Sequence, residues 1–185
     1  MDTTEGEGAF QDLLALEHLK PNTRNLDLGG GEHDDGTEYL AEHRIASQVL
    51  DPFMRTTSHN EKVIADVRSH PVDSVTTNSV LNVIDRAETR IEHITTAHDA
   101  LKPGGIALFK VWPGIESNEG VWSATSFQSN RAAESYVAEV GSVFGEGNVS
   151  LNAEHKLIVA TKSNSSGDAH IESTRANAER SPRLS

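Results

Sequence analysis

A triple glycine follows a short apolar run early in the chain, and acidic residues come directly after it. Residues 25–35 read NLDLGGGEHDD. The apolar part predicts a buried strand, and glycines allow the backbone to turn sharply and to approach a ligand closely. Gly29, Gly30 and Gly31 therefore predict a ligand-binding turn between a strand and a helix.

The acids after the turn indicate the kind of ligand. A dinucleotide site uses the spacing G-x-G-x-x-G and rests a pyrophosphate on the start of the next helix. Counted from Gly29 and Gly31, the third glycine would fall on Asp34, and this acid with Glu32 and Asp35 would repel a pyrophosphate. S-adenosylmethionine carries a sulfonium and an ammonium group, so the turn favours a methyltransferase over a nucleotide-binding oxidoreductase. A solvated glycine-rich loop is the simpler alternative, because short glycine motifs are weak signals.

The composition limits the classes of partner and the location. The 185 residues are enough for one domain with a real core. The chain has no cysteine, which excludes a disulfide framework, a thiol nucleophile and a cysteine-bound metal. The net charge of -12 argues against a broad basic surface that tracks a nucleic-acid backbone. Without a membrane-length apolar run or a signal-like start, we expect a cytoplasmic protein that makes no membrane contact. Its oligomeric state stays open.

Hydrophobic periodicity predicts helices and strands in alternation. The expected helices are Ala9–Leu19, Gly36–His43, Arg86–Leu101 and Arg131–Phe144, and the expected strands are the run before the glycines, Ile45–Leu50, Lys62–Ala65, Asp73–Thr77, Ile106–Val111, Asn148–Asn152 and Lys156–Thr161. This order predicts an α/β fold: a doubly wound, Rossmann-like and mostly parallel sheet of about seven strands, the last antiparallel, flanked by helices. Residues 1–162 form the domain, and the polar composition of 163–185 predicts a disordered tail.

Each of the first five predicted strands delivers a polar residue at its carboxyl end, where open α/β sheets bind their ligands. The five residues are Asp27, Asp51, Asp66, Asn78 and Lys110. Asp51 lies at the interval from the glycines at which an acid meets a ribose diol, and Asp66 is placed to accept from an adenine amino group. Any one of them has the alternative role of a turn or cap residue, since Asp and Asn favour strand ends.

Three motifs resemble class I S-adenosylmethionine-dependent methyltransferases. The segment 26–31 is similar to their first motif, 49–51 to their ribose-binding acid, and 100–105 to the turn that follows the catalytic region. The resemblance covers roughly 22–162. His33 departs from it, because common members place another glycine near that position.

A narrower resemblance rests on three further segments, 77–84, 109–112 and 126–128. They look like a small group from phages and bacteria that is related to the methyltransferases associated with DNA phosphorothioation. This resemblance favours a modified nucleic acid or nucleotide as the methyl acceptor over a lipid or an amine.

The class resemblance implies a role for each residue of the predicted binding edge. It implies that the turn holds the methionine part of S-adenosylmethionine, that Asp51 holds the ribose and that Asp66 holds the adenine. Asp27, Gly29 and Gly31, with Gly30 between them, would contact the methionine moiety, and Asn78 would lie beside the methyl group.

Missing motifs narrow the chemistry. Residues 78–81 are not the Asn/Asp-Pro-Pro-aromatic tetrad of amino-methylating nucleic-acid enzymes, and a cytosine-C5 enzyme needs a cysteine. Lys110 is similar to a lysine of ribose 2'-O-methyltransferases, but Asn78 stands where those enzymes place an acid. Two alternatives therefore remain beside an active methyltransferase: a catalytically silent S-adenosylmethionine-binding module and a 2'-O-methyltransferase-like RNA enzyme. The histidine spacing predicts no metal site.

The acceptor pocket is predicted at the ends of the fourth and fifth expected strands. Asn78 and Lys110 are the candidate catalytic residues, and Asn82 and Trp112 are the candidate substrate contacts. Trp112 offers a flat surface for a planar substrate, or else a hydrophobic plug beneath the loop 113–129. That loop is long enough to close over the site as a lid.

Overall fold

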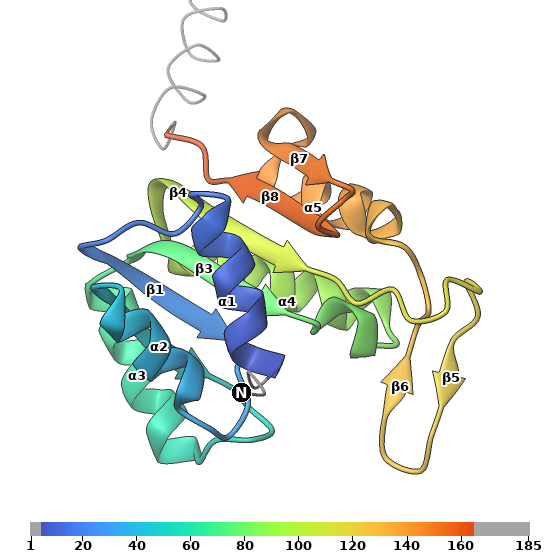
Figure 1. The fold of residues 1–185 in the computed structure, drawn as a ribbon, viewed down its shortest axis with the longest axis horizontal. Helices are drawn as coiled ribbons and strands as arrows, with labels where there is room; N and C mark the ends of the chain where they lie inside the picture. The colour runs from blue at the N-terminus through green and yellow to red at the C-terminus, as the bar shows by residue number, and fades with distance from the viewer. Residues whose placement is uncertain (1–4, 165–185) are drawn as a thin grey trace, which may run out of the picture.

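The computed structural model describes residues 5–164, and within them a mixed sheet is flanked by helices (Figure 1). The helices are α1 Glu5–Ala15, α2 Asp35–Glu42, α3 Thr57–Ser69, α4 Ala87–Ala100 and α5 Val137–Phe144, with short 3-10 helices η1 Leu81–Val83, η2 Ala133–Tyr136 and η3 Glu146–Asn148. The strands are β1 Thr23–Leu28, β2 Ile45–Leu50, β3 Val72–Asn78, β4 Leu101–Lys110, β5 Val121–Trp122, β6 Phe127–Gln128, β7 Val149–Asn152 and β8 Leu157–Thr161.

The main sheet has the strand order β2-β1-β3-β4-β8-β7. Strands β2, β1, β3 and β4 run parallel, whereas β8 is antiparallel to β4 and to β7. The predicted doubly wound, mostly parallel α/β fold is therefore confirmed, and so is the closing antiparallel hairpin. Asp27, Asn78 and Lys110 lie at or next to the carboxyl ends of their strands, and Asp51 follows its strand directly.

The strand predicted over Lys62–Ala65 is wrong, because these residues lie inside helix α3. Val63 and Val67 are one helical turn apart and are both buried, which gives the segment a helical apolar face. The Thr56 side chain accepts from the backbone N–H of His59 at 3.2 Å and caps the helix start. Within the described residues the sheet consequently has six strands, and the missing one is the strand that would have ended at Asp66.

Two predicted helices differ in their ends. The first helix spans Glu5–Ala15 and stops before Leu19, although Phe10, Leu13 and Leu19 are buried as expected. The segment predicted as one helix over Arg131–Phe144 is divided into η2 and α5. The predicted tail, 163–185, lies outside the described residues from 165 onward.

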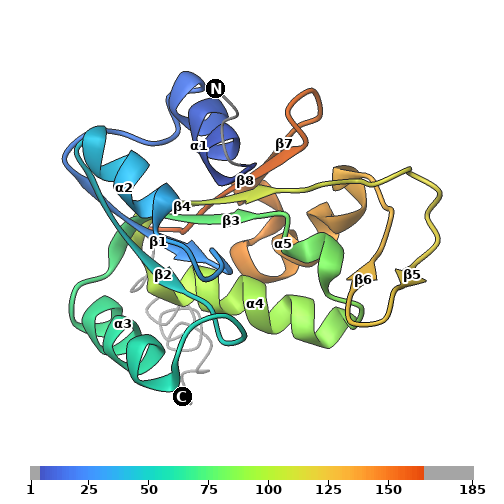
Figure 2. The same cartoon turned by 60° about the horizontal axis from the view of Figure 1, so that its bottom comes forward.

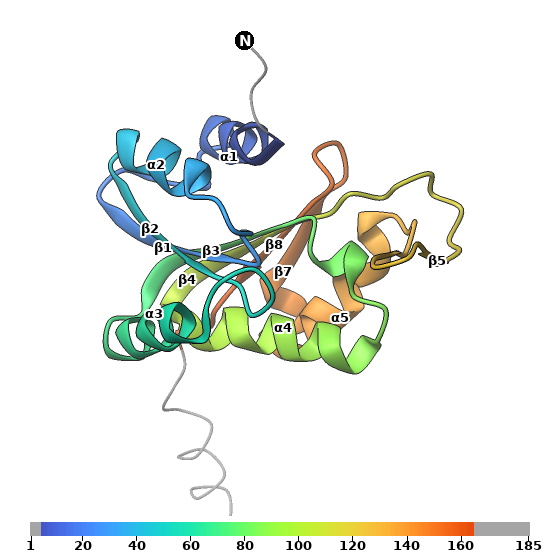
Figure 3. The ribbon, with the colours of Figure 1, turned by 90° about the horizontal axis from the view of Figure 1, so that it is seen from below.

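The helices form two layers, with α1 and α2 on one face of the sheet and α3, α4 and α5 on the other (Figure 3). Helix α4 runs along the sheet on the face away from α1 (Figure 2). One buried cluster, which includes Leu26, Val75 and Phe109, lies beneath α4 and α5. A smaller cluster around Phe10, Leu13 and Leu40 joins α1 and α2 to the sheet.

Residues 113–129 form an arm that carries the β5–β6 hairpin and stands away from the sheet (Figure 1). Its strand β5 is apolar: Val121 and Trp122 are exposed, and the Trp122 ring packs against Phe127 of β6 with 5.3 Å between the ring centroids. None of the helices in the described part of the chain has the length and hydrophobicity that crossing a bilayer requires.

Candidate functional site

The three glycines after β1 are required for different reasons. Gly29 and Gly31 have φ angles of 82° and 80°, which disfavour residues with a side chain. A Cβ on Gly29 would also lie 2.7 Å from a methyl group of Val80, and a Cβ on Gly30 would lie 2.3 Å from the Asp27 carboxylate. The turn therefore packs tightly against the start of the β3–η1 connection and against Asp27.

Asp51 and Arg55, which both follow β2 in the chain, hold the glycine turn in place. The Asp51 carboxylate accepts from the Gly31 N–H at 2.9 Å, and it also accepts from the N–H groups of Phe53 and Met54 at 3.0 Å. Arg55 donates to the Gly31 carbonyl at 2.7 Å. The predicted ribose acid is thus buried directly beside the turn, with a role in ordering it.

A cavity of about 410 Å³ opens beside the turn. Its charged walls are the carboxylates of Asp27, Glu32 and Asp35, and none of the described residues that line it is a lysine or an arginine. Ala9 and Phe10 of α1 also border it. The cavity is accordingly open to a ligand with cationic character and unfavourable for a phosphate.

Asn78 borders the same cavity with an unused acceptor. Its Oδ1 atom is buried and has no hydrogen-bond partner among the described residues. A buried carbonyl oxygen without a donor costs free energy, so a ligand that brings an N–H or O–H group to it would be stabilised.

The Asp27 carboxyl group is buried at the floor of this cavity. Burial raises the pKa of Asp27 to about 6, and the negative charge of Asp51 acts in the same direction. The hydrogen bond from Thr76 and the charge of Arg55 oppose the rise. A nearby cation would favour the ionised form of Asp27 and would be favoured by it.

Asp66 is not part of this arrangement, which corrects the prediction of an adenine contact. It lies on α3, and its carboxylate accepts from Gln48 at 2.8 Å and pairs with Arg24 near the start of β1. The hydrogen bond from Gln48 is the main cause that lowers the pKa of Asp66. Arg24 lies near the amino end of β1, so Asp66 is directed away from the carboxyl edge.

Lys110 and Asn78 are neighbours in the β3–β4 register, as predicted from their strand ends. The Lys110 ammonium group pairs with Asp12 of α1, an acid from the first helix and not from the end of β3, where Asn78 stands. This ion pair fixes α1 to the end of β4.

Asn82 and Trp112 do not line the cavity beside the turn. Asn82 is buried, and its amide donates to Gln128 at 3.1 Å and accepts from the Trp112 N–H at 3.3 Å. Asn82 therefore holds the base of the arm. The Trp112 residue is 57% exposed, so it is not a plug beneath residues 113–129.

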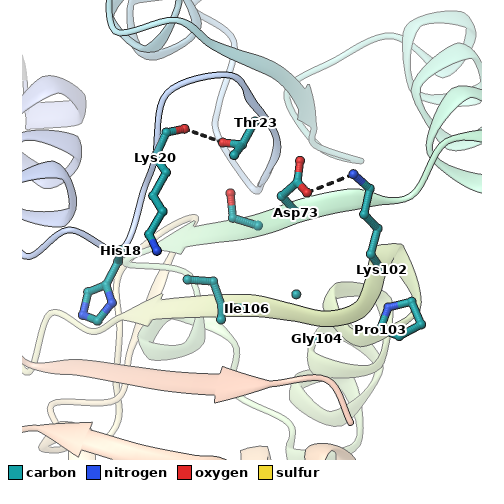
Figure 4. A pocket seen from close by; sticks show the side chains of 10 residues that line it. His18, Lys20, Thr23, Asp73, Lys102, Pro103, Gly104 and Ile106 are labelled. Carbon is teal, nitrogen blue, oxygen red and sulfur yellow. Dashed lines mark hydrogen bonds and ion pairs between the residues drawn. The ribbon is translucent and has the colours of Figure 1, made fainter. Parts of the chain in front are cut away.

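A second cavity of about 300 Å³ lies at the opposite, amino edge of the sheet (Figure 4). Lys102 borders it and donates to Asp73 at 2.9 Å. None of the predicted site residues lines this cavity. Among the described residues no cluster of three or more His, Asp or Glu side chains is arranged to hold a metal ion.

Neither a protein-family model nor a curated protein matches the sequence significantly. Solved structures do match the fold. The sugar N-methyltransferase KedS8 from a Streptoalloteichus species has a TM-score of 0.55 and 15% identity, over 86% of this chain and 87% of its own. CalS10, an amino pentose methyltransferase from Micromonospora echinaspora solved with S-adenosylmethionine bound, has a TM-score of 0.53 and 14% identity, over 87% of this chain and 92% of its own.

The chain has the fold of S-adenosylmethionine-dependent methyltransferases. A protein-(glutamine-N5) methyltransferase from Alicyclobacillus acidocaldarius shares it at a TM-score of 0.50 and 10% identity, over 86% of this chain and 94% of its own. The methyl acceptors named for these three proteins differ, so the likeness shows the fold and leaves the acceptor open. The narrower resemblance to the phosphorothioation-associated group is not supported by these matches.

Several residues of the site are missing from the sequence prediction. Ala9 and Phe10 reach the cavity from α1, and Arg55 holds the turn from the β2–α3 connection. No local sequence signal marks these three. The sequence does mark Thr76 and Asn25, because each is a polar residue two positions from another polar residue in a buried strand.

Proposed function

We propose that the protein is an S-adenosylmethionine-dependent methyltransferase. The observation that carries the proposal is the chemistry of the cavity beside the glycine turn. Among its described residues it offers three carboxylates and one unpartnered amide oxygen, and neither lysine nor arginine. This is the complement of a sulfonium and an ammonium group, and it disfavours the pyrophosphate of a nicotinamide or flavin dinucleotide.

The proposed cofactor fits the residues around the turn. Asp27 and the Oδ1 atom of Asn78 would face the cationic amino-acid half. Asp51, which accepts from the Gly31 N–H beside the cavity, would hold the ribose hydroxyls. Phe53 follows the acid closely and is 93% exposed, which leaves its flat ring free to stack on the adenine that Asp66 does not reach. The first turn of α2 borders the cavity at Gly36 and Thr37, and its N–H groups would suit the methionine carboxylate.

When bound, S-adenosylmethionine supplies an already activated methyl carbon, so the protein contributes position, alignment and exclusion of water. Such positioning contributes about 7–11 kcal/mol when the geometry is good. Asn78, with its amide oxygen turned to the cofactor, would lie beside the methyl group that the acceptor approaches. Lys110 is held by Asp12, so it would act as a fixed positive charge at the end of β4.

Calorimetric titration with S-adenosylmethionine tests the cofactor. We expect micromolar affinity for the wild type and no measurable affinity for NAD. Asp51→Asn should weaken binding at least tenfold, about 1.4 kcal/mol. Asp66→Asn is the matched control, since it changes an acid on α3 that does not line the cavity, and it should bind like the wild type. Unchanged affinity of Asp51→Asn, with its thermal melt preserved, would remove Asp51 from the ribose site.

The acceptor needs a separate experiment. Transfer of a labelled methyl group to DNA, RNA, protein and metabolite fractions should be compared among the wild type, Asn78→Ala and Lys110→Ala. We propose a nucleic acid or nucleotide, on the narrower sequence resemblance alone. Label found only in protein or in a non-nucleotide metabolite would refute that class, and wild-type transfer by both variants would remove Asn78 and Lys110 from the acceptor pocket. Tight cofactor binding without transfer to any fraction would indicate the catalytically silent module.

A further inference from the structure

A chain of polar side chains crosses the sheet beneath α1 and α2. Ser74 donates to Asn25 Oδ1 at 2.8 Å, Asn25 donates to Thr76 Oγ1 at 3.0 Å, and Thr76 donates to Asp27 Oδ1 at 3.0 Å. All four residues are buried. The chain begins at Ser74, which borders the amino-edge cavity, and ends at Asp27 in the cavity beside the glycine turn.

The strand register produces this chain. Asn25 pairs with Ser74, and Asp27 pairs with Thr76, between the parallel strands β1 and β3. Because side chains alternate between faces along a strand, all four point to the α1–α2 face. The two strands therefore place a polar stripe on a face that is otherwise apolar.

The direction of each hydrogen bond follows from the donors available. Thr76 has a single hydroxyl proton, and it accepts from the Asn25 amide, so that proton is donated to Asp27. The remaining Asn25 N–H is donated to Ser47 at 3.1 Å. The three hydrogen bonds Ser74 to Asn25, Asn25 to Thr76 and Thr76 to Asp27 thus all run in one direction and end at Asp27, which favours the carboxylate over the carboxylic acid.

The two oxygens of Asp27 have different surroundings. Oδ1 accepts from Thr76, whereas Oδ2 lies where a Cβ on Gly30 would come within 2.3 Å. The missing side chain at Gly30 is what leaves Oδ2 room beside the turn. One oxygen anchors the carboxylate and the other faces the ligand side.

We propose that Thr76 is a positioning residue for Asp27: backed by Asn25 and Ser74, it holds the carboxylate ionised with its second oxygen presented to the ammonium group of the cofactor. The inference rests on the proposed function and adds to it the residue that orients the acid. Thr76 is fully buried and does not line the cavity beside the glycine turn, so it would act only through Asp27.

Other charged groups around the cavity must be kept constant in a test. Asp51 and Arg55 act on Asp27 from the β2–α3 connection. Glu32 and Asp35 line the cavity from the turn and from α2, and His33 lines it as well. On α1, Asp12 is paired with Lys110 of β4. A His33→Gln background leaves carboxylates as the titratable groups that line the cavity.

The affinity for S-adenosylmethionine should be measured between about pH 5 and pH 8 in that background. We expect the parent to lose affinity as the pH falls through about 6. Thr76→Val keeps the shape and removes the donor, so it should move the midpoint to higher pH and weaken binding at neutral pH by roughly fivefold. Thr76→Ser should restore the parent's midpoint. Ser47→Ala, which removes a hydrogen bond off the path to Asp27, should leave it unchanged.

A carboxyl carbon NMR titration of Asp27, assigned with Asp27→Asn, gives a readout that needs no cofactor. The Asp27 pKa should be higher in Thr76→Val than in the parent. If Thr76→Val folds poorly, Ser74→Ala gives a smaller shift in the same direction. An unshifted Asp27 titration in a folded Thr76→Val would overturn the positioning role. Absence of S-adenosylmethionine binding by the wild type at every pH, with the NMR shift present, would instead reject the proposed function.

Discussion

Beneath α4 and α5 the strands contribute leucine, valine, alanine and phenylalanine side chains, whereas beneath α1 and α2 the middle strands contribute Asn25, Ser74, Thr76 and Asp27. The side chains named on both faces are buried. The first packs by shape and apolar area, which stabilises without direction. The second packs by hydrogen bonds, each of which requires one orientation of its partner.

The difference indicates what each face does for the site. A buried polar network contributes little net stability, because its bonds replace bonds to water. It fixes the orientation of a carboxylate that apolar neighbours would leave free to rotate or to take up a proton. The apolar face therefore supplies the stability, and the polar face supplies the geometry of the cavity beside the turn.

The largest stability effect should follow from a cavity in the apolar face. Phe109 is fully buried and meets Phe144 edge to face at 6.3 Å between ring centroids. Phe109→Ala should lower the free energy of unfolding by about 3–5 kcal/mol, measured by urea denaturation. Trp122→Ala, which removes an exposed aromatic ring from the arm, is the control and should change stability by less than about 0.5 kcal/mol. A small loss for Phe109→Ala would show that the apolar face is not the main source of stability.

Asp27→Asn should stabilise the ligand-free protein while it weakens cofactor binding. The Asp27 pKa rises from 3.8 to about 6 in the folded protein. The stability that goes with this rise is fully present below pH 3.8 and is lost as the pH rises through about 6, so the ionised carboxylate costs about 3 kcal/mol at neutral pH. Melting temperatures should therefore favour the variant most at about pH 7.5 and less at about pH 5, with the difference disappearing only below pH 3.8. A variant that melts below the wild type at both values would contradict this cost.

His93, on the α4–α5 side of the sheet, should make stability depend on pH in the opposite direction to Asp27. His93 of α4 contacts Thr77 Oγ1 at 2.7 Å, and burial lowers the pKa of His93 from 6.5 to about 4. Its contribution to stability is present above pH 6.5 and is lost as the pH falls through about 4. His93→Gln should therefore lose less stability on acidification than the wild type does. His33→Gln, which changes an exposed side chain, is the control, and an equal response in both variants would exclude the role of burial.

Much of the fold could be predicted because periodicity and turn residues are local signals. Strand Ile45–Leu50 is predicted with the bounds that the structure has, and Asp51 directly follows it. The error over Lys62–Ala65 came from a short apolar pair, which periodicity alone cannot divide between a strand and a helix. The helical spacing of Val63 and Val67 decides for the helix only once the capping residue Thr56 is also considered.

The site was predictable only where a strand end marks it. The glycine turn, Asp27 and Asn78 border one cavity because parallel strands end at the same edge. Phe10 reaches that cavity through the packing of α1 on α2, which no local pattern encodes. Lys110 was predicted at its strand end, but its partner Asp12 is 98 residues away in sequence and depends on where α1 docks.

The smallest effect on stability is expected for removal of the residues that follow β8. Strand β8 ends at Thr161 opposite Ile106 of β4, and the Asn164 side chain lies next to Gly104. Residues 165–185 are rich in Ser, Glu and Arg and contain two large aliphatic residues, too few to offset the entropy cost of ordering. Truncation after residue 164 should leave the melting temperature and the affinity for S-adenosylmethionine unchanged, whereas truncation after residue 156 removes β8 and should abolish folding. A large drop in melting temperature for the shorter truncation would mean that part of 165–185 packs on one of the two faces and contributes to it.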